Sequence, residues 1–87
     1  MNQQQLDQMA QQAAWLQAQS HQYAGLSDCV RDSQKLLTDA QNLARARAAM
    51  LQLGWANHAS DAQVRLDGMA ANMDRCVWRA KNHLAGY

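Results

Sequence analysis

The residues that build β-strands are almost absent from this chain of 87 residues. Ile and Phe do not occur, and only three Val, one Thr and two Tyr are present. Strands depend on β-branched and aromatic residues, so this supply is too small for even two good strands. By contrast, 17 Ala and 13 Gln favour helices, and no Pro interrupts them. The sequence therefore predicts an all-α fold.

Two glycines divide the chain into three segments of similar length. Gly25 and Gly54 are each followed by a large apolar residue, a common way for a helix to end because glycine tolerates the left-handed conformation. Ser27 and Ser60 then supply hydroxyl N-caps, each with an aspartate in the positive first turn. Within a single domain, residues 1–87, we expect helices at about 3–24, 27–53 and 60–85, with a 54–59 connection that can itself be partly helical.

Apolar residues recur at alternating spacings of three and four in each segment, as in helices that pack lengthwise on a neighbour. The seams, with the few polar residues that share their spacing, are Leu6, Met9, Ala13, Leu16, Ser20 and Tyr23; Cys29, Ser33, Leu36, Ala40, Leu43, Arg47 and Met50, widened by Val30, Leu37, Ala44 and Leu51; and Ala62, Leu66, Met69, Met73, Cys76, Ala80 and His83, flanked by Ala70, Val77 and Leu84. Short connections make successive helices antiparallel. The sequence predicts a small antiparallel three-helix bundle with coiled-coil-like seams, or a helical hairpin that dimerises. Because the core is lean, we expect a homo-oligomer, most simply a homodimer.

The chain shows no sign of a membrane segment or of a disulfide-rich scaffold. No stretch approaches the roughly 20 apolar residues of a span, and the first residues lack the basic and then apolar pattern of a signal peptide. Cys29 and Cys76 stand far apart, unlike a disulfide framework or a zinc motif. We expect a cytoplasmic protein with no membrane partner. A disulfide between the two cysteines stays geometrically open if the helices are offset.

The sequence predicts no catalytic, cofactor or metal site. Catalysis needs converging carboxylates, a histidine beside a nucleophile or a phosphate-binding glycine loop, but the chain lacks Glu and its four glycines are dispersed. His21, Cys29, Cys76 and His83 fall near one end of the expected bundle. However, Cys76 and His83 are about 10 Å apart along one helix, too far for ligands of one zinc ion. We expect a protein that is not an enzyme.

Trp78 lies on the polar side of the third helix, opposite its apolar seam. Arg75, Arg79 and Lys81 surround it, and Trp and Arg are enriched among the residues that dominate protein interfaces. Trp15 holds a similar but less extreme place beside the seam of the first helix. We predict that these five residues bind a partner. The alternative is structural: Trp78 covers a neighbouring helix, and Trp15 packs along the edge of the bundle.

These features predict a non-enzymatic helical protein–protein interaction module, in the form of a bacterial or phage-encoded inhibitor or adaptor that binds a larger protein. The second hypothesis is a weak nucleic-acid-binding accessory protein that uses the basic residues of the second and third helices. A formal net charge of +1 is far from the strongly basic surface of such proteins. Few phosphate contacts would also make the binding weak and sensitive to salt.

Overall fold

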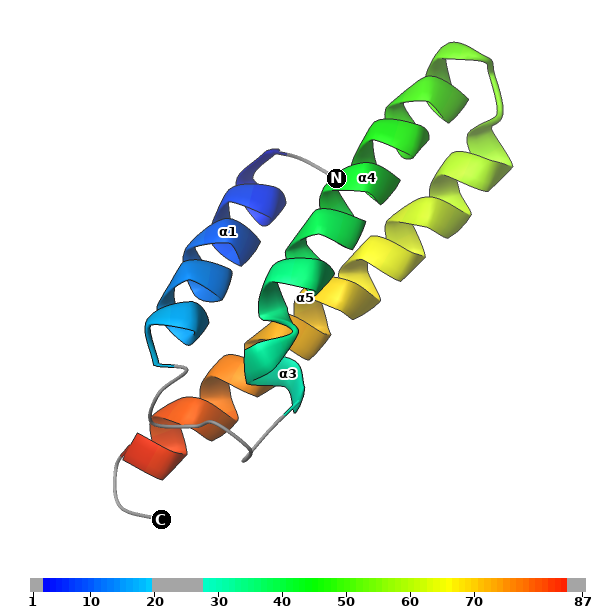
Figure 1. Ribbon diagram of the computed structural model, residues 1–87. Coiled ribbons are helices and arrows are strands. Elements are labelled where there is room, and N and C mark those ends of the chain that lie inside the picture. Colours follow the sequence, from blue (N-terminus) through cyan, green and yellow to red (C-terminus); the bar gives the residue numbers. More distant parts are fainter. Residues whose placement is uncertain (1–2, 20–27, 85–87) are drawn as a thin grey trace.

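The computed structural model describes residues 3–19 and 28–84, and these residues form helices without any strand. Figure 1 shows the four helices, which are α1 (Gln3–Ala18), α3 (Asp28–Arg31), α4 (Ser33–Gln52) and α5 (Ala56–Leu84). The all-α prediction is confirmed for this part of the chain. The helix end predicted at Gly25 and the cap predicted at Ser27 lie outside the described residues.

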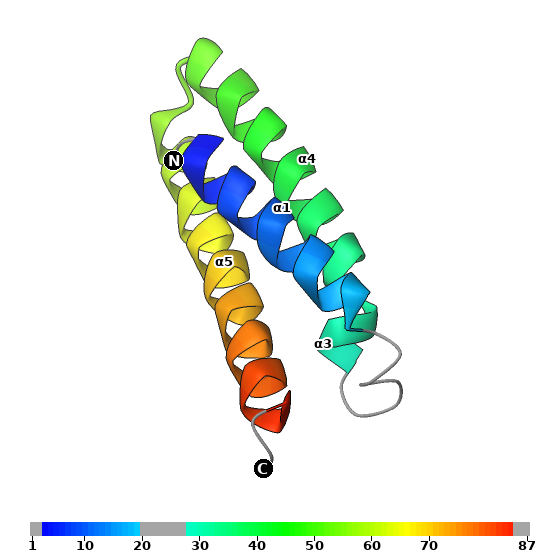
Figure 2. The same cartoon turned by 90° about the vertical axis from the view of Figure 1, so that its left-hand side faces the viewer.

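α4 and α5 form a long antiparallel hairpin, and α1 lies along the groove between them (Figure 2). The molecule is a rod of 49 × 20 × 17 Å. Two glutamine side chains of α1 fix its register on α5: Gln5 Nε2 donates to Asp67 Oδ1 at 3.1 Å, and Gln12 Nε2 donates to Asp74 Oδ1 at 2.6 Å. Both pairs join residues 62 apart in sequence. α1 therefore runs parallel to α5, in constant register.

The core consists mainly of residues from the predicted apolar seams. Its buried members are Met9, Ala13, Leu16, Val30, Leu37, Ala40, Leu66, Met73, Cys76 and Ala80. A buried serine lies beside them: the Ser33 hydroxyl donates to the Val30 carbonyl at 3.0 Å and accepts from Gln17 Nε2 at 2.7 Å. Buried polar groups need such partners. Gln17 therefore joins α1 to the start of α4 through hydrogen bonds as well as through apolar contact.

The helix predicted over 27–53 is interrupted at Asp32, whose backbone (φ −95°, ψ 8°) separates α3 from α4. The carbonyl of Val30 accepts hydrogen bonds from two side chains, the Ser33 hydroxyl and the Gln17 amide, the latter at 3.2 Å. Side chains that bond a backbone carbonyl in this way compete with the regular helix ladder and bend it. Periodicity alone does not reveal this break, because Gln17 comes from another helix.

The turn between α4 and α5 follows the glycine prediction. Gly54 has φ 77°, its N–H donates to the Leu51 carbonyl at 3.1 Å, and the Trp55 N–H donates to the Met50 carbonyl at 2.8 Å. These two bonds define a Schellman motif, which ends a helix with glycine in the left-handed conformation. The N-cap expected at Ser60 is wrong. α5 starts at Ala56, because the turn is already complete at Trp55, whose carbonyl accepts from Ala59 N–H at 3.0 Å.

Candidate functional surface

One face of α5 points away from the other helices. We call it the outer face; its residues recur at spacings of four and three and are Val64, Gly68, Ala71, Arg75 and Trp78. Val64 is 70 % exposed and Trp78 is 67 % exposed, the highest values for large apolar residues in the described part of the chain. The opposite side of the same helix carries Leu66 and Met73, which are buried in the core. The outer face is therefore a stripe on which Val64, Gly68, Arg75 and Trp78 are exposed and Ala71 is half-buried.

Gly68 occupies the middle of this stripe. Glycine inside a helix costs about 0.5–1 kcal/mol relative to alanine, so its presence needs a reason. Its φ is not positive, and a Cβ atom placed on it would meet no atom within 4 Å. Neither the backbone nor the packing of the described chain requires glycine here. On an exposed helix face, glycine lets the backbone of another molecule approach closely.

Two shallow pockets flank the C-terminal half of the outer face, and Arg79 lines both of them. The first, of about 400 Å³, is also lined by Trp78, Asn82 and His83. The second, of about 470 Å³, lies between α5 and the α3–α4 segment. Its lining combines cationic, anionic, apolar and sulfur groups. They come from Arg75, Met73 and Cys76 on α5 and from Cys29, Asp32 and Leu36 on the facing segment. Both pockets offer a cationic rim beside apolar surface.

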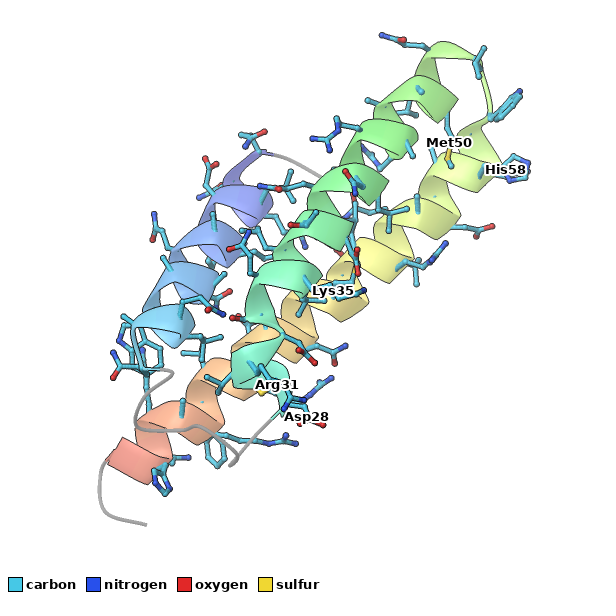
Figure 3. All side chains as sticks on the ribbon, in the orientation of Figure 1. Asp28, Arg31, Lys35, Met50 and His58 are labelled. Atoms are coloured by element: carbon cyan, nitrogen blue, oxygen red, sulfur yellow. A yellow bond between two sulfur atoms is a disulfide. The ribbon has the colours of Figure 1, made fainter. Side chains whose placement is uncertain are left out.

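The ion pairs of the described residues lie on α3 and α4. Arg31 pairs with Asp28 at 2.7 Å and with Asp32 at 3.6 Å, and Lys35 pairs with Asp39 at 2.8 Å; Figure 3 shows Asp28 and Arg31 side by side. The hydrogen bond from Lys35 to Asp39 raises the pKa of that lysine above its ordinary value.

Basic side chains without an ion pair in this part of the chain lie on α5 and on the second half of α4. They are Arg45, Arg47, Arg65, Arg75, Arg79 and Lys81. Arg65 makes no ion pair with Asp61, although an aspartate four residues before an arginine on a helix is a common pairing. Arg75 donates to the side chain of Asn72 instead of to a carboxylate. The two arginines beside Trp78 therefore keep their positive charge free for an anionic group.

A disulfide joins Cys29 to Cys76, with the two Cα atoms 6.0 Å apart. It ties the short helix α3 to α5 and forms part of the wall of the larger pocket. The sequence alone does not decide whether the two cysteines form this disulfide. Among the described residues, no group of three or more His, Cys, Asp or Glu side chains is placed to hold a metal ion; His21 lies outside them.

The five predicted partner-binding residues fall on two different sides. Trp78 and Arg75 lie on the outer face, each beside one of its pockets, and Arg79 lines both pockets. Lys81 instead lies over the ring of Trp15, with its Nζ 5.7 Å from the ring centre, and Trp15 packs partly buried against the core. Sequence reasoning missed Val64 and Gly68, although their four–three spacing with Trp78 could have revealed them.

Comparison with protein-family models, curated proteins and solved structures finds no match for this chain. No helix in the described ranges combines the length and the apolarity needed to cross a bilayer.

Proposed function

We propose that the protein is a non-enzymatic interaction module, an inhibitor or adaptor of bacterial or phage origin, that binds a larger protein through the outer face of α5. The observation that carries this proposal is the exposure of Trp78 beside two arginines that have no carboxylate partner in the described chain. Burying a tryptophan at an interface removes a large apolar area from water, and Trp and Arg dominate binding energies.

The chemistry of the outer face favours an amphipathic helix as the element of the partner that docks there. Val64 and Trp78 lie on either side of Gly68, so a crossing helix would meet two apolar contacts and a point of close backbone approach. Arg75 and Arg79 would face acidic side chains along one edge of that helix. The pattern resembles helix-on-helix packing at a protein interface, in which a few large side chains supply most of the affinity.

The test is capture of the target by the tagged, oxidised chain, with Trp78→Ala and Gly68→Leu beside the wild type. Both variants should retain the helix signal in circular dichroism, because both side chains point away from the core. We expect the wild type to capture one protein in stoichiometric amount and both variants to fail to capture it. Trp55→Ala is the matched control, since it removes another exposed tryptophan at the far end of the rod. Equal capture by all four proteins would exclude the outer face.

Salt and nuclease separate this proposal from the nucleic-acid alternative. Binding to phosphates through arginines collapses between roughly 50 and 200 mM salt, whereas an interface anchored by Trp78 persists. If the amount of captured partner depends on nucleic acid and is unchanged by Trp78→Ala, the nucleic-acid-binding hypothesis is favoured.

We propose further that the single chain, with α1 packed on the α4–α5 hairpin as a three-helix bundle, is the working unit. The hydrogen bonds of Gln5 and Gln12 to α5 support it, since a hairpin that dimerised through the same groove would have to displace α1. The homodimer expected from the sequence stays a prediction, and sedimentation at micromolar concentrations tests it.

The cytoplasmic location also stays a prediction, and the Cys29–Cys76 bond weighs against it. Structural disulfides persist in oxidising compartments and are rare in the cytosol. We therefore propose an oxidising compartment as the working environment. Alkylation of the protein in intact cells, followed by mass measurement, distinguishes bonded cysteines from free thiols.

A further inference from the structure

The end of the α4–α5 hairpin carries a second exposed apolar surface, separate from the outer face of α5. We call residues 48–60 the hairpin tip; this stretch contains no charged residue. Three large apolar side chains within it are exposed: Leu51 (49 %), Leu53 (62 %) and Trp55 (53 %). Figures 1 and 2 both show the tip projecting beyond the N-terminal end of α1. No helix of the described chain covers it.

The tip is held in a defined shape by the Schellman turn. The hydrogen bonds from Gly54 and Trp55 back to α4 fix the chain where it reverses direction. The Trp55 ring also meets the His58 ring edge to face, with centres 5.8 Å apart, and Figure 3 shows His58 and Met50 on the two helices beside the turn. Leu53 and Trp55 are thus presented at the end of the rod on an ordered backbone.

A cationic collar surrounds the base of the tip. It consists of Arg45, Arg47 and Arg65, with Asp61 as the one carboxylate between the tip and Arg65. None of the three arginines has an ion pair among the described residues, and the Nε of Arg47 is buried without a hydrogen-bond partner. Arg47 precedes Leu53 by six residues, about 9 Å of helix. By the same rise, Arg45 lies about 12 Å from Leu53 and Arg65 about 15 Å from Trp55. Arg47 therefore lies at about the depth to which interfacial segments enter a membrane, roughly 5–10 Å, and the other two arginines lie just beyond that depth.

We propose that the hairpin tip binds the surface of an anionic lipid membrane. Leu51, Leu53 and Trp55 enter the boundary between headgroups and acyl chains, where tryptophan is enriched, and the collar arginines bind lipid phosphates, which match the guanidinium fork. A protein partner fits less well. The tip is the convex end of a narrow rod, and three side chains fall far short of the roughly 800 Å² per partner of a stable protein interface. A bilayer needs no complementary groove.

The sequence predicts no membrane partner because no segment can span a bilayer, but the contact proposed for the tip is peripheral. Peripheral binding needs only an exposed apolar end and a matching charge. The proposal is independent of the outer face, because Trp78 lies 23 residues along α5 from Trp55 and belongs to the opposite end of the helix.

The test uses the full oxidised chain and vesicles made of equal parts phosphatidylglycerol and phosphatidylcholine. A protein with Trp15→Phe and Trp78→Phe keeps Trp55 as its one tryptophan, and a matched protein with Trp15→Phe and Trp55→Phe keeps Trp78. Circular dichroism checks that both are folded. We expect vesicles with brominated acyl chains to quench Trp55 and leave Trp78 unquenched. Equal quenching of both, or of neither, would overturn the proposal.

Substitutions in the otherwise wild-type chain supply the second measurement. Leu53→Gln should lower the vesicle partition coefficient about tenfold, the loss expected when one large apolar side chain leaves the interface. Arg45→Gln with Arg65→Gln should weaken binding to anionic vesicles and leave the weak binding to pure phosphatidylcholine unchanged. Trp78→Ala should alter neither value, so failure of the proposed protein-binding function would leave this result standing. Two results together would show that the tip binds a second copy and that the membrane proposal is wrong. The wild type would self-associate in sedimentation without binding vesicles, and Leu53→Gln would abolish the self-association.

Discussion

The two ends of the α4–α5 hairpin carry the same apolar pattern but differ in burial. Along α3 and α4, the positions Val30, Leu37, Ala44 and Leu51 follow at intervals of seven and share one face. Val30 and Leu37 are buried, Ala44 is partly buried and Leu51 is 49 % exposed. The change follows the extent of α1, which covers one end of the groove and stops before the other. A periodic pattern therefore shows which face can be buried, and a neighbouring element decides whether it is.

The largest expected effect is on the free energy of unfolding, and it distinguishes a leucine of the covered core from a leucine of the exposed tip. Leu66 is buried under α1 and α4, so Leu66→Ala should lower the free energy of unfolding by about 2–5 kcal/mol through lost burial and a residual cavity. Leu53→Ala at the tip should change it by no more than about 0.5 kcal/mol, since the side chain is already mostly in water. Urea unfolding followed by circular dichroism measures both. Similar losses for the two variants would mean that the tip is buried by something in solution.

Removing the disulfide should affect the covered end and spare the tip. Cys29→Ala with Cys76→Ala opens a loop whose ends are 47 residues apart, and such cross-links contribute about 2–4 kcal/mol to stability. Hydrogen exchange should show lost protection in α3 and in the facing turns of α5, with exchange at the tip unchanged. Reductant should have a similar effect on the wild type and none on the double variant. Identical stability of the wild type with and without reductant would show that the bond contributes nothing.

Much of the covered end could be predicted from the sequence, because local rules govern it. The three–four spacing gives the buried positions of α1 and α5, and the glycine rule gives the turn at Gly54, whose positive φ the fold requires. The break at Asp32 could not be predicted, because one of the two side-chain hydrogen bonds to the Val30 carbonyl beside it comes from Gln17 on another helix. The cysteine pairing stayed open for the same reason: it depends on the offset between helices, and spacing along one helix does not fix that offset.

The candidate surfaces were predicted less completely. Trp78 and the arginines beside it can be predicted from the sequence as binding residues, because a tryptophan on a polar helix face is unusual. Val64, Gly68 and the tip residues cannot, since single exposed apolar residues are ordinary in sequence. Their significance depends on their exposure in the folded chain and on the empty space around Gly68.

The two glycines of the described chain, Gly68 inside α5 and Gly54 in the turn before it, should give smaller effects of opposite sign. Gly68→Ala should raise the free energy of unfolding by about 0.5–1 kcal/mol, since alanine favours the helix and its Cβ meets open space. Gly54→Ala should lower it by about 1 kcal/mol or more, because φ 77° is strained for alanine. Thermal unfolding of both variants checks the signs. A stabilised Gly68→Ala that also loses its protein target would mean that glycine is kept for binding; a destabilised one would give Gly68 a role in the fold.

The smallest expected effect concerns Asp67, at the border between the covered groove and the free tip. Hydrogen bonds from Gln5 and Gln63 lower the pKa of Asp67 below its ordinary value of 3.8. The folded state therefore favours the carboxylate, so the contribution of Asp67 is present above that ordinary pKa and is lost as the pH falls through the lower pKa of the folded state. Asp67→Asn removes this titration.

We expect the wild type to be slightly more stable than Asp67→Asn at neutral pH, and the difference to shrink in acid below about pH 4. Because the carboxylate is fully exposed, the effect should be small and should weaken further in salt. Hydrogen exchange in the first turns of α1 is the sensitive measurement, since Gln5 lies there. Faster exchange confined to those turns would show that Asp67 sets where the covered groove ends. A difference that is constant with pH would mean that the glutamine bonds do not distinguish the carboxylate from the acid, and that apolar contact alone holds α1 at this border.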